Sequence, residues 1–342
     1  MPKVPNGTIL NNKYRIDAFL KEGGMGQVYK GTDIATNKDI VIKFVKYHHD
    51  GQDPIREDKL KVEANVLKKL IHVPNIVKYI ADGTDSNHGF FLVIDFIRGE
   101  TLKDNYLGKI CPDKDLHKIC NVLLSTLEYL HGQNIIYRDL SPDNIMASAS
   151  GDFVLIDFGA VKEGFSGLSQ SVATGIGKAD YGPPEQLQGY PTYQSDIFSV
   201  GATMWFLVTG LPPRMRDTSG RILSAKLSNR GVSDHIDSII LKATEPDVAK
   251  RYQNTDEMMK ALIGSSIQKT QYPRFILANK IYSLIDDLYI IGRENNISNP
   301  GIQINDPNKF ISTRQARAYK MNGKWFIENL ASKSEHNKTY IN

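Results

Sequence analysis

The chain has 342 residues, of which 41% are hydrophobic and 23% charged, a composition typical of a folded globular protein. A formal net charge of +4 is small for this length and argues against a nucleic-acid-binding protein. Cys111 and Cys120 are too few for a disulfide framework or a zinc site, so we expect a reducing, cytoplasmic location. No signal peptide is visible, and the apolar stretch 198–211 is too short to span a bilayer, so we expect a buried helix there and no membrane association.

The first two thirds of the chain change from strand patterns to helix patterns. Residues 13–46 alternate short apolar runs with turns, which predicts strands. Residues 56–70 place Leu60, Ala64, Leu67 and Leu70 on one face and predict an amphipathic helix. Two strands follow, the second ending at 91–94, and helices are then predicted at 115–131, 194–209, 233–244 and 255–263. This order predicts an α+β protein with a small β-rich lobe followed by a larger helical lobe.

The pattern changes again after about residue 264. Short apolar runs separated by Gly, Asn, Asp and Pro predict strands at 274–278, 281–284, 288–291, 302–304, 316–320 and 324–328. We therefore expect a separate all-β module over 274–342, most simply a sandwich, joined by a linker over 265–273.

A glycine-rich turn lies between the first two strands. Gly23, Gly24 and Gly26 would allow backbone N–H groups to approach phosphates closely. A tight hairpin also needs glycine, so this motif alone leaves both interpretations open.

Two charged residues follow in the same lobe. Lys43 ends an apolar strand and Glu63 lies in the predicted helix, and each by itself would ordinarily be a solvated residue. Together they could form an ion pair that holds the lysine against the α- and β-phosphates of a nucleotide.

Three polar residues with possible chemistry come next. Asp139 could accept the proton of an attacking hydroxyl, and Asn144 and Asp157 offer the oxygen ligands that Mg²⁺ prefers. The segments around them could instead be an ordinary turn and a strand end. The order of all these motifs along one chain makes that alternative weak.

Taken in this order, residues 12–264 resemble the protein kinases. The local sequences around the glycines and around 183–186 are similar to those of bacterial Ser/Thr kinases. The resemblance implies a bilobal kinase fold with ATP and Mg²⁺ as cofactors and proteins as substrates. It implies that Lys43 and Glu63 position the nucleotide, that Asp139 is the catalytic base, and that Asn144 and Asp157 bind the metal.

The same resemblance assigns supporting positions. Asp95, Phe96 and Ile97 look like the hinge that meets adenine, with Ile94 behind it. Glu185 should pair with Arg251, and Asp196 should brace the catalytic loop. The remaining nucleotide contacts implied are Leu20, Val28, Val41 and Met146.

Four positions depart from the usual kinase pattern: Lys21, Val41, Tyr137 and Ser141 replace a glycine, an alanine, a histidine and a lysine. The change at Ser141 is the most consequential, because the lysine there normally neutralises charge on the transferring phosphoryl group.

A lysine elsewhere in the chain could replace the positive charge that is missing at Ser141. Lys178, seven residues before Glu185, stands where a threonine is usual, so the ammonium and the hydroxyl would have exchanged places around Asp139. The alternative is that Lys178 is a solvent-facing loop residue. The segment between Asp157 and Glu185 also carries candidate phosphorylation sites, Thr174 first and Ser171 second.

Residues 274–342 resemble a forkhead-associated (FHA) domain, a β-sandwich that binds phosphothreonine peptides. The resemblance assigns Arg293 and Ser312 to the phosphate and Asn337 to the peptide backbone, although these segments could simply be turns. Gln315, Thr313 and Lys338 depart from that family's pattern. We expect the module to be incomplete, because the family continues for further strands.

The sequence therefore predicts a Ser/Thr protein kinase that phosphorylates its own activation segment and carries a phosphothreonine-reading module. The alternative is a pseudokinase scaffold that works through its FHA-like module. A small-molecule phosphotransferase is disfavoured by the segment 183–186 and the helices after it. The sequence does not indicate which oligomeric state the protein adopts.

Overall fold

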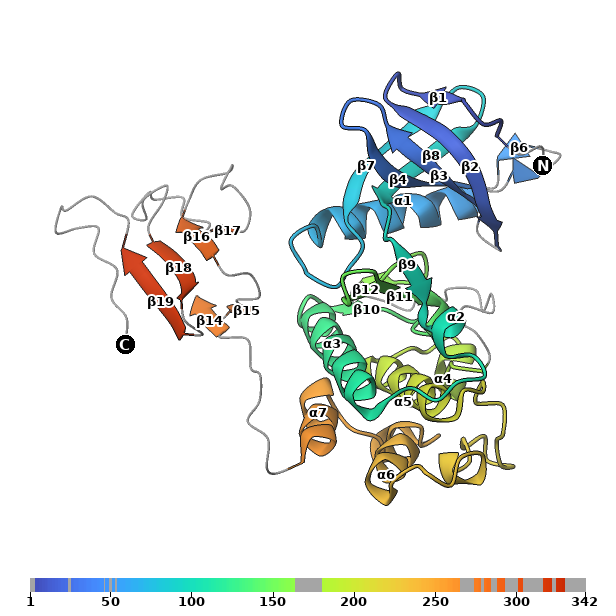
Figure 1. The fold of residues 1–342 in the computed structure, drawn as a ribbon, viewed down its shortest axis with the longest axis vertical. Helices are drawn as coiled ribbons and strands as arrows, with labels where there is room; N and C mark the ends of the chain where they lie inside the picture. The colour runs from blue at the N-terminus through green and yellow to red at the C-terminus, as the bar shows by residue number, and fades with distance from the viewer. Residues whose placement is uncertain are drawn as a thin grey trace. The chain divides into compact units, whose positions relative to one another are not determined.

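The structure is a computed structural model. It describes residues 4–23, 26–45, 47–48, 51–52, 54–163 and 180–264, and beyond these only the backbone of six strands (Figure 1). The chain divides into two units, the first covering residues 1–71 and 75–267 and the second residues 72–74 and 268–342.

The N-terminal lobe is built on a six-stranded antiparallel sheet. Its order is β1-β2-β3-β4-β8-β7, and one helix, α1 (Pro54–Lys69), packs against β4, β7 and β8 (Figure 1). The strands are β1 (Ile9–Leu10), β2 (Tyr14–Glu22), β3 (Gly26–Asp33), β4 (Lys38–Val45), β7 (Tyr79–Asp85) and β8 (Gly89–Asp95), with a short hairpin of β5 (Tyr47–His48) and β6 (Gly51–Gln52) between β4 and α1. The β-rich start and the amphipathic helix predicted from the sequence are both present.

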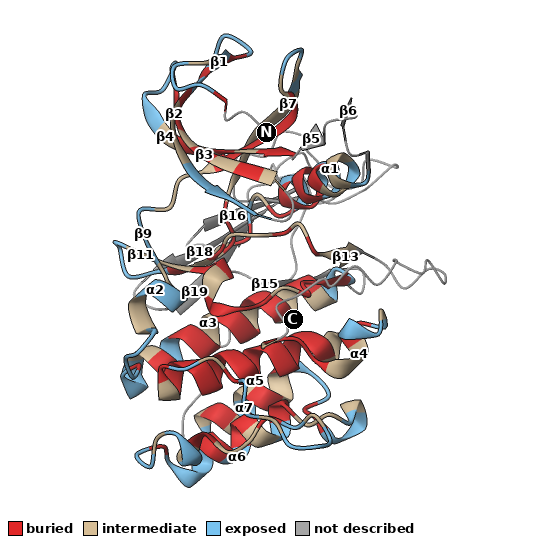
Figure 2. Cartoon of the chain, turned by 90° about the vertical axis from the view of Figure 1, so that its right-hand side faces the viewer, coloured by how far each residue is buried: buried red, intermediate tan, exposed pale blue. Residues whose placement is uncertain are grey.

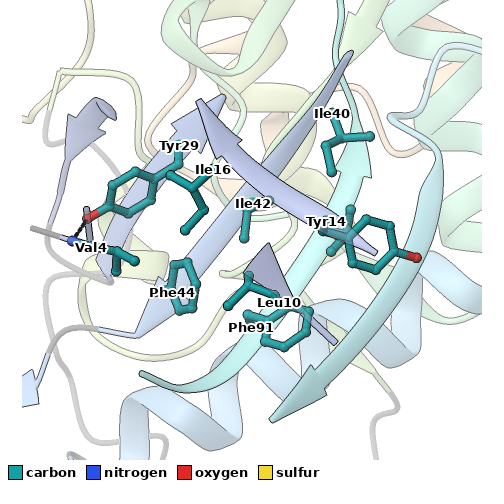
Figure 3. Close-up of a cluster of buried hydrophobic side chains, with 10 residues drawn as sticks. Val4, Leu10, Tyr14, Ile16, Tyr29, Ile40, Ile42, Phe44 and Phe91 are labelled. Atoms are coloured by element: carbon teal, nitrogen blue, oxygen red, sulfur yellow. Dashed lines mark hydrogen bonds between the residues drawn. The ribbon is translucent and has the colours of Figure 1, made fainter. Parts of the chain in front are cut away.

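One face of this sheet carries an apolar core. The alternation of buried and exposed residues along β3 and β4 directs every second side chain into it. Its buried members are Val4, Leu10, Tyr14, Ile16, Tyr29, Ile40, Ile42, Phe44, Phe91 and Val93, most of them labelled in Figure 3. Val4 and Leu10 come from the chain at or before the first strand, so the N-terminal segment is part of the core.

The second lobe is helical. It contains α2 (Leu102–Tyr106), α3 (Asp113–Gly132), α4 (Pro184–Leu187), α5 (Tyr193–Thr209), α6 (Asp234–Ala243) and α7 (Thr255–Ile263). Short strands line its upper edge: β9 (Gly99–Thr101), β10 (Ile135–Ile136), β11 (Ile145–Ser148), β12 (Phe153–Leu155) and β13 (Lys162–Glu163). Three 3₁₀ turns lie at Pro142–Asn144, Ala225–Leu227 and Val248–Lys250.

Helix α5 is the centre of this lobe. Its residues from Ser195 to Val208 are all buried, and α3 and α6 pack against it (Figure 2). A Cβ on Gly201 would lie 2.7 Å from the Cβ of Ala243, so glycine allows α5 and α6 to approach closely. The helix ends at Gly210, whose φ of 71° is the left-handed conformation that glycine adopts freely. The prediction of a buried helix at the apolar stretch 198–211 is confirmed.

None of the helices in the described residues has the length and apolar composition needed to cross a bilayer.

The C-terminal strands form a hairpin and a four-stranded sheet. The hairpin is β14 (Arg274–Leu277) with β15 (Lys280–Ser283). The sheet has the order β17-β16-β18-β19, built from β16 (Leu288–Gly292), β17 (Gly301–Gln303), β18 (Ala316–Met321) and β19 (Lys324–Asn329), and only the β16–β17 pair is parallel. Strands therefore occur at or near the predicted ranges, while their assembly into a sandwich stays a prediction.

Candidate active site

A partly buried network of three charges lies between the N-terminal sheet and the loop after β12. Lys43 Nζ on β4 is 2.6 Å from Glu63 Oε1 on α1 and 3.4 Å from Asp157 Oδ1. The Glu63 side chain is 3% exposed, and its Oε1 also accepts the Phe158 backbone N–H at 3.3 Å. Gly159 N donates to Asp157 Oδ1 at 3.1 Å. The predicted ion pair is present, and Asp157 joins it.

The charge states of this network follow from the balance of burial and attraction. Burial by itself would lower the pKa of Lys43, but the carboxylates of Asp157 and Glu63 outweigh it and hold that pKa well above the ordinary value. Burial would raise the pKa of Asp157, yet the Lys43 ammonium and the Gly159 N–H hold it below the ordinary value. At neutral pH the lysine is therefore cationic and Asp157 is ionised.

The residues predicted to surround a nucleotide fall on one face of the sheet. In antiparallel register Val28 lies opposite Lys43, and Val41 lies opposite Ile94. Directly opposed residues point the same way, so these four side chains share a face. Lys21 is opposite Val28 and belongs to the same face.

Lys21 has an electrostatic effect that the sequence analysis missed. Its ammonium contributes to the lowered pKa of Asp157, so it adds positive charge on the side of the sheet that carries Lys43. The signal in the sequence was the replacement of a glycine by a cation at this position.

The other predicted nucleotide contacts lie around this face. Asp95 ends β8 and Ile97 lies in the segment that links β8 to β9; both are partly buried. Met146 on β11 is partly buried and paired with both Thr101 and Val154. Leu20 sits at a register shift in β2 and is 46% exposed.

The glycine-rich turn owes one of its glycines to packing. A Cβ on Gly26 would lie 1.8 Å from the Phe44 carbonyl oxygen, so any side chain there would displace β4. Gly23 N donates to Gly26 O at 2.9 Å and closes the hairpin, and a Cβ on Gly23 would meet no atom of the described residues within 4 Å. The packing interpretation therefore holds for Gly26, while the approach of a phosphate to this turn stays a prediction.

The loop that carries Asp139 is anchored at both ends. Asn144 Nδ2 donates to Asp139 Oδ2 at 2.7 Å and to its carbonyl oxygen at 2.8 Å. Asn144 O accepts the Ile156 N–H at 3.1 Å, which ties this loop to the strand leading to Asp157. The asparagine therefore orients Asp139 and lies beside the Asp157 segment.

Asp196 on α5 holds the start of the same loop. Its two oxygens accept the Tyr137 N–H at 2.9 Å and the Arg138 N–H at 2.8 Å, and His131 Nε2 lies 2.8 Å from Oδ2. Arg138 has a φ of 72°, a strained value for a side chain of this size. The predicted bracing by Asp196 is present.

Two further residues position this loop and were not foreseen. His131 contributes through Asp196, and Gln186, which is buried, donates from Nε2 to Arg138 O at 2.7 Å. Gln186 directly follows Glu185 in the sequence, so its place in the motif was the available signal.

The atypical residues Tyr137 and Ser141 are both buried, at 0% and 1% exposure. The Tyr137 ring meets Phe158 with centroids 5.1 Å apart at 76°, an edge-to-face contact. The ring that replaces the usual histidine is therefore packed against Phe158.

Glu185 and Arg251 form a two-pronged ion pair, as predicted. The Arg251 nitrogens lie 2.7 and 2.8 Å from the two Glu185 oxygens, and Ser195 Oγ donates to Glu185 Oε1 at 2.7 Å. This pair fixes α4 against the helical lobe beside the loop that carries Asp139.

The described residues hold no group of three or more His, Cys, Asp or Glu side chains that could bind a metal by themselves. Asp157 and Asn144 provide one carboxylate and one amide oxygen on adjoining segments. This is the small protein ligand set that suits Mg²⁺ when phosphates complete its coordination.

Several predicted residues lie outside the described residues: Gly24, Thr174, Ser171, Lys178, Arg293, Ser312 and Asn337.

Comparison with known proteins agrees with this geometry. Residues 14–283 match the model of the protein kinase domain, so the chain belongs to this family. It is 31% identical to the serine/threonine-protein kinase PknA of Nostoc sp. over 74% of this chain and 47% of that protein, and 28% identical to the serine/threonine-protein kinase PrkC of Bacillus subtilis over 74% of this chain and 40% of that protein. The chain thus spans less than half the length of these relatives.

Among solved structures, the kinase domain of PknI from Mycobacterium tuberculosis is similar in fold. The TM-score is 0.61 at 19% identity, covering 76% of this chain and 98% of that one. This likeness supports the bilobal arrangement of a β-rich and a helical lobe.

Proposed function

We propose that this chain is an active Ser/Thr protein kinase that transfers the γ-phosphate of ATP to hydroxyl groups of proteins. The observation that carries the proposal is the partly buried network of Lys43, Glu63 and Asp157. Glu63 is almost fully buried, and burying a carboxylate costs several kcal/mol before it is paired. A pseudokinase scaffold would have no need to keep such a network next to an oriented Asp139.

Each residue has a distinct part in the proposed reaction. Mg²⁺-bound ATP would supply the phosphoryl group and the charge neutralisation around it. Lys43, held by Glu63, would contact the α- and β-phosphates, and Asn144 and Asp157 would hold the metal. Asp139, oriented by Asn144, would accept the proton of the substrate hydroxyl.

The adenine would lie on the shared face of the sheet. Val28 and Val41 would cover it from above and Met146 from below, with Leu20 at the rim. Ile94 would close the back of the site, and the backbone at Asp95 and Ile97 would meet the adenine edge.

The catalytic base lacks its usual lysine neighbour, and we propose that Lys178 replaces it. Ser141 would supply the hydroxyl and Lys178 the ammonium beside the transferring phosphate. Lys178→Ala is expected to lower phosphoryl transfer by ~10²-fold while leaving ATP affinity nearly unchanged. Undiminished turnover would show that the exchange is coincidental.

The test of the main proposal measures binding and transfer separately. Mg-ATP at a hundredfold excess over its dissociation constant should stabilise the chain by about 2–3 kcal/mol, seen as a rise in melting midpoint. Transfer of radiolabel to the chain itself or to a generic protein substrate should be abolished by Asp139→Asn. Binding without any transfer would support the scaffold alternative, and absence of both would contradict the proposal.

We further propose that the kinase phosphorylates its own activation segment, at Thr174 first and Ser171 second. Arg138 supports this: its side chain is buried, burial lowers its pKa, and its Nε has no hydrogen-bond partner among the described residues. Such an arginine can pair with a phosphate. Mass spectrometry after incubation with Mg-ATP should find the modification, and an active enzyme with an unmodified segment would contradict it.

The last component of the proposal is phosphothreonine recognition by residues 274–342. Arg293 and Ser312 would contact the phosphate and Asn337 the peptide backbone. A phosphorylated Thr174 peptide should bind more tightly than its unmodified form, and Arg293→Ala should remove the difference. Equal affinity of the intact chain for both peptides would contradict it.

A further inference from the structure

The N-terminal segment is bonded to the sheet of the first lobe. Gly7 N donates to Ile16 O at 2.7 Å, and Ile16 N donates to Thr8 O at 2.9 Å, so the segment runs along β2. Val4 and Leu10 are 7% and 0% exposed in the core on that face. This segment is therefore a packed part of the lobe.

A chain of side-chain hydrogen bonds leads from this segment to the glycine-rich turn. Val4 N donates to Tyr29 Oη at 2.9 Å (Figure 3), and Tyr29 Oη donates to Gln27 Oε1 at 2.6 Å. Gln27 Nε2 then donates to Glu22 Oε2 at 3.2 Å. Glu22 and Gln27 are the opposed residues of β2 and β3 at the open end of this hairpin, directly beside Gly23 and Gly26.

Burial makes this chain of bonds specific. Tyr29 is 0% and Gln27 2% exposed, so neither can exchange its partner for water without opening the core. Phe19 and Phe44 contact the Tyr29 ring edge-on, with centroids 5.5 and 5.7 Å away. Burial raises the pKa of Tyr29, and the Glu22 carboxylate adds to this, so the hydroxyl keeps its proton and remains a donor at neutral pH.

The bonds run behind the nucleotide face. Successive side chains of a strand point to opposite faces, so Gln27 and Tyr29 lie on the core side while Val28 between them lies on the face shared with Lys43. The position of this hairpin determines where Val28 and the turn stand relative to Lys43. A bond on the back of the hairpin can therefore affect binding on its front.

We propose that Tyr29 is a positioning residue for the nucleotide, coupling the N-terminal segment at Val4 to the glycine-rich turn through Gln27 and Glu22. The inference rests on the ATP binding proposed above. Without the Tyr29 hydroxyl, the Val4 N–H and the side-chain amide oxygen of Gln27 lose their buried partner. The fraction of molecules in which the hairpin has the geometry that binds nucleotide then falls. Apparent affinity falls by that fraction.

The test compares two identical chemical changes in one core. Tyr29→Phe removes the hydroxyl of the proposed coupling, and Tyr14→Phe removes that of another buried tyrosine of the same core, which takes no part in this chain of bonds. In the full chain, Tyr29→Phe should weaken Mg-ATP binding about fivefold, at the lower end of typical couplings between sites. Tyr14→Phe should stay within about twofold, well below that coupling. The KM for ATP should rise with Tyr29→Phe while kcat at saturating ATP is retained.

A second pair of variants tests the other end of the coupling. Val4→Pro removes the N–H donor, and Val4→Ala keeps it while reducing the packing. Pro5 follows Val4 and already favours an extended backbone there, which proline tolerates. Val4→Pro should match Tyr29→Phe in nucleotide affinity, Val4→Ala should not, and the effects of Val4→Pro and Tyr29→Phe should not add, because they break one bond.

The outcomes separate this inference from the proposed function. If the unaltered chain binds no Mg-ATP, both fail. If it binds and Tyr29→Phe behaves like Tyr14→Phe, only the positioning role fails. Should Tyr29→Phe lower the nucleotide-free melting midpoint so far that it does not fold, the Val4 pair decides, and equal affinities for Val4→Pro and Val4→Ala overturn the inference.

Discussion

At the scale of single residues, Lys21 and Tyr137, which depart from the usual kinase pattern, lie in different physical environments. Lys21 lies on the face of the sheet that carries Lys43 and influences Asp157. Tyr137 is buried and its ring packs against Phe158. Its buried hydroxyl has no partner of hydrogen-bond geometry among the described residues, so its burial is unfavourable. Burial raises the pKa of Tyr137, and the Asp157 backbone offsets this only in part.

Tyr137→Phe should therefore leave stability unchanged or raise it by up to about 1 kcal/mol. The hydroxyl is buried without a partner of hydrogen-bond geometry among the described residues, so removing it sheds a desolvation cost. Chemical denaturation of both forms measures the difference. A loss of more than about 1 kcal/mol would mean that the hydroxyl is bonded in solution.

At the scale of elements, two helices of the second lobe hold the catalytic loop through buried polar groups. Asp196 on α5 and Gln186 on α4 bind the loop directly, and the neighbouring Glu185 is tied to Arg251. Arg251 has no exposed side-chain surface and also donates to the carbonyls of Glu245, Gln194 and Pro246. This pair therefore joins three separate segments around α4.

Arg251→Ala should destabilise the first unit by about 3–5 kcal/mol, because it leaves the Glu185 carboxylate enclosed without its partner. Arg214→Ala is the control: its pair with Asp180 is exposed, so its loss should cost less than about 1 kcal/mol. Denaturant unfolding of the three proteins measures both changes.

The same variants should differ in their response to acid. Burial would raise the pKa of Glu185, but hydrogen bonds from Arg251 and Ser195 outweigh it and place that pKa below the ordinary value. A lowered pKa contributes stability that is present above the unfolded-state value, about 4.5, and is lost as pH falls through the folded-state value. Arg251→Ala should therefore lose less stability than the unaltered chain between pH 5 and pH 3. Parallel pH profiles would show that Glu185 is not the group responsible.

At the scale of the whole molecule, the chain is two units with different sequence patterns. The family match extends to residue 283, beyond the end of α7 and through the β14–β15 hairpin, whereas the first unit ends at Ile267. The sequence placed the end of the kinase domain at 264, and that boundary is still a prediction.

A fragment ending at Ile267 tests it. We expect this fragment to fold, to melt within about 2 °C of the first transition of the full chain, and to bind Mg-ATP with unchanged affinity, because the cores and the charge network described above lie before residue 264. A second fragment ending at Ser283 is the comparison. If only the longer fragment is stable, the hairpin belongs to the kinase domain.

The sequence by itself determined the order of the lobes and singled out the candidate site residues. The strand and helix periodicities located the β-rich start, α1 and the buried α5. The motif order singled out Lys43, Glu63, Asp139, Asn144 and Asp157. Phosphoryl transfer needs particular residue types in a fixed order, and such an order can be recognised in the sequence. The pair Lys43–Glu63 followed from the same pattern, and the pair Glu185–Arg251 followed from the resemblance to the protein kinases.

Only the tertiary structure decided how these residues meet. It brought Asp157 to Lys43, placed Lys21 on the same face of the sheet as Lys43 through the register of β2, β3 and β4, and assigned Gly26 to the close approach of Phe44. It also joined Val4 to Tyr29 and His131 to Asp196. Such contacts depend on strand register and on the packing of segments far apart in the chain, and neither is encoded in the local periodicity from which elements are recognised.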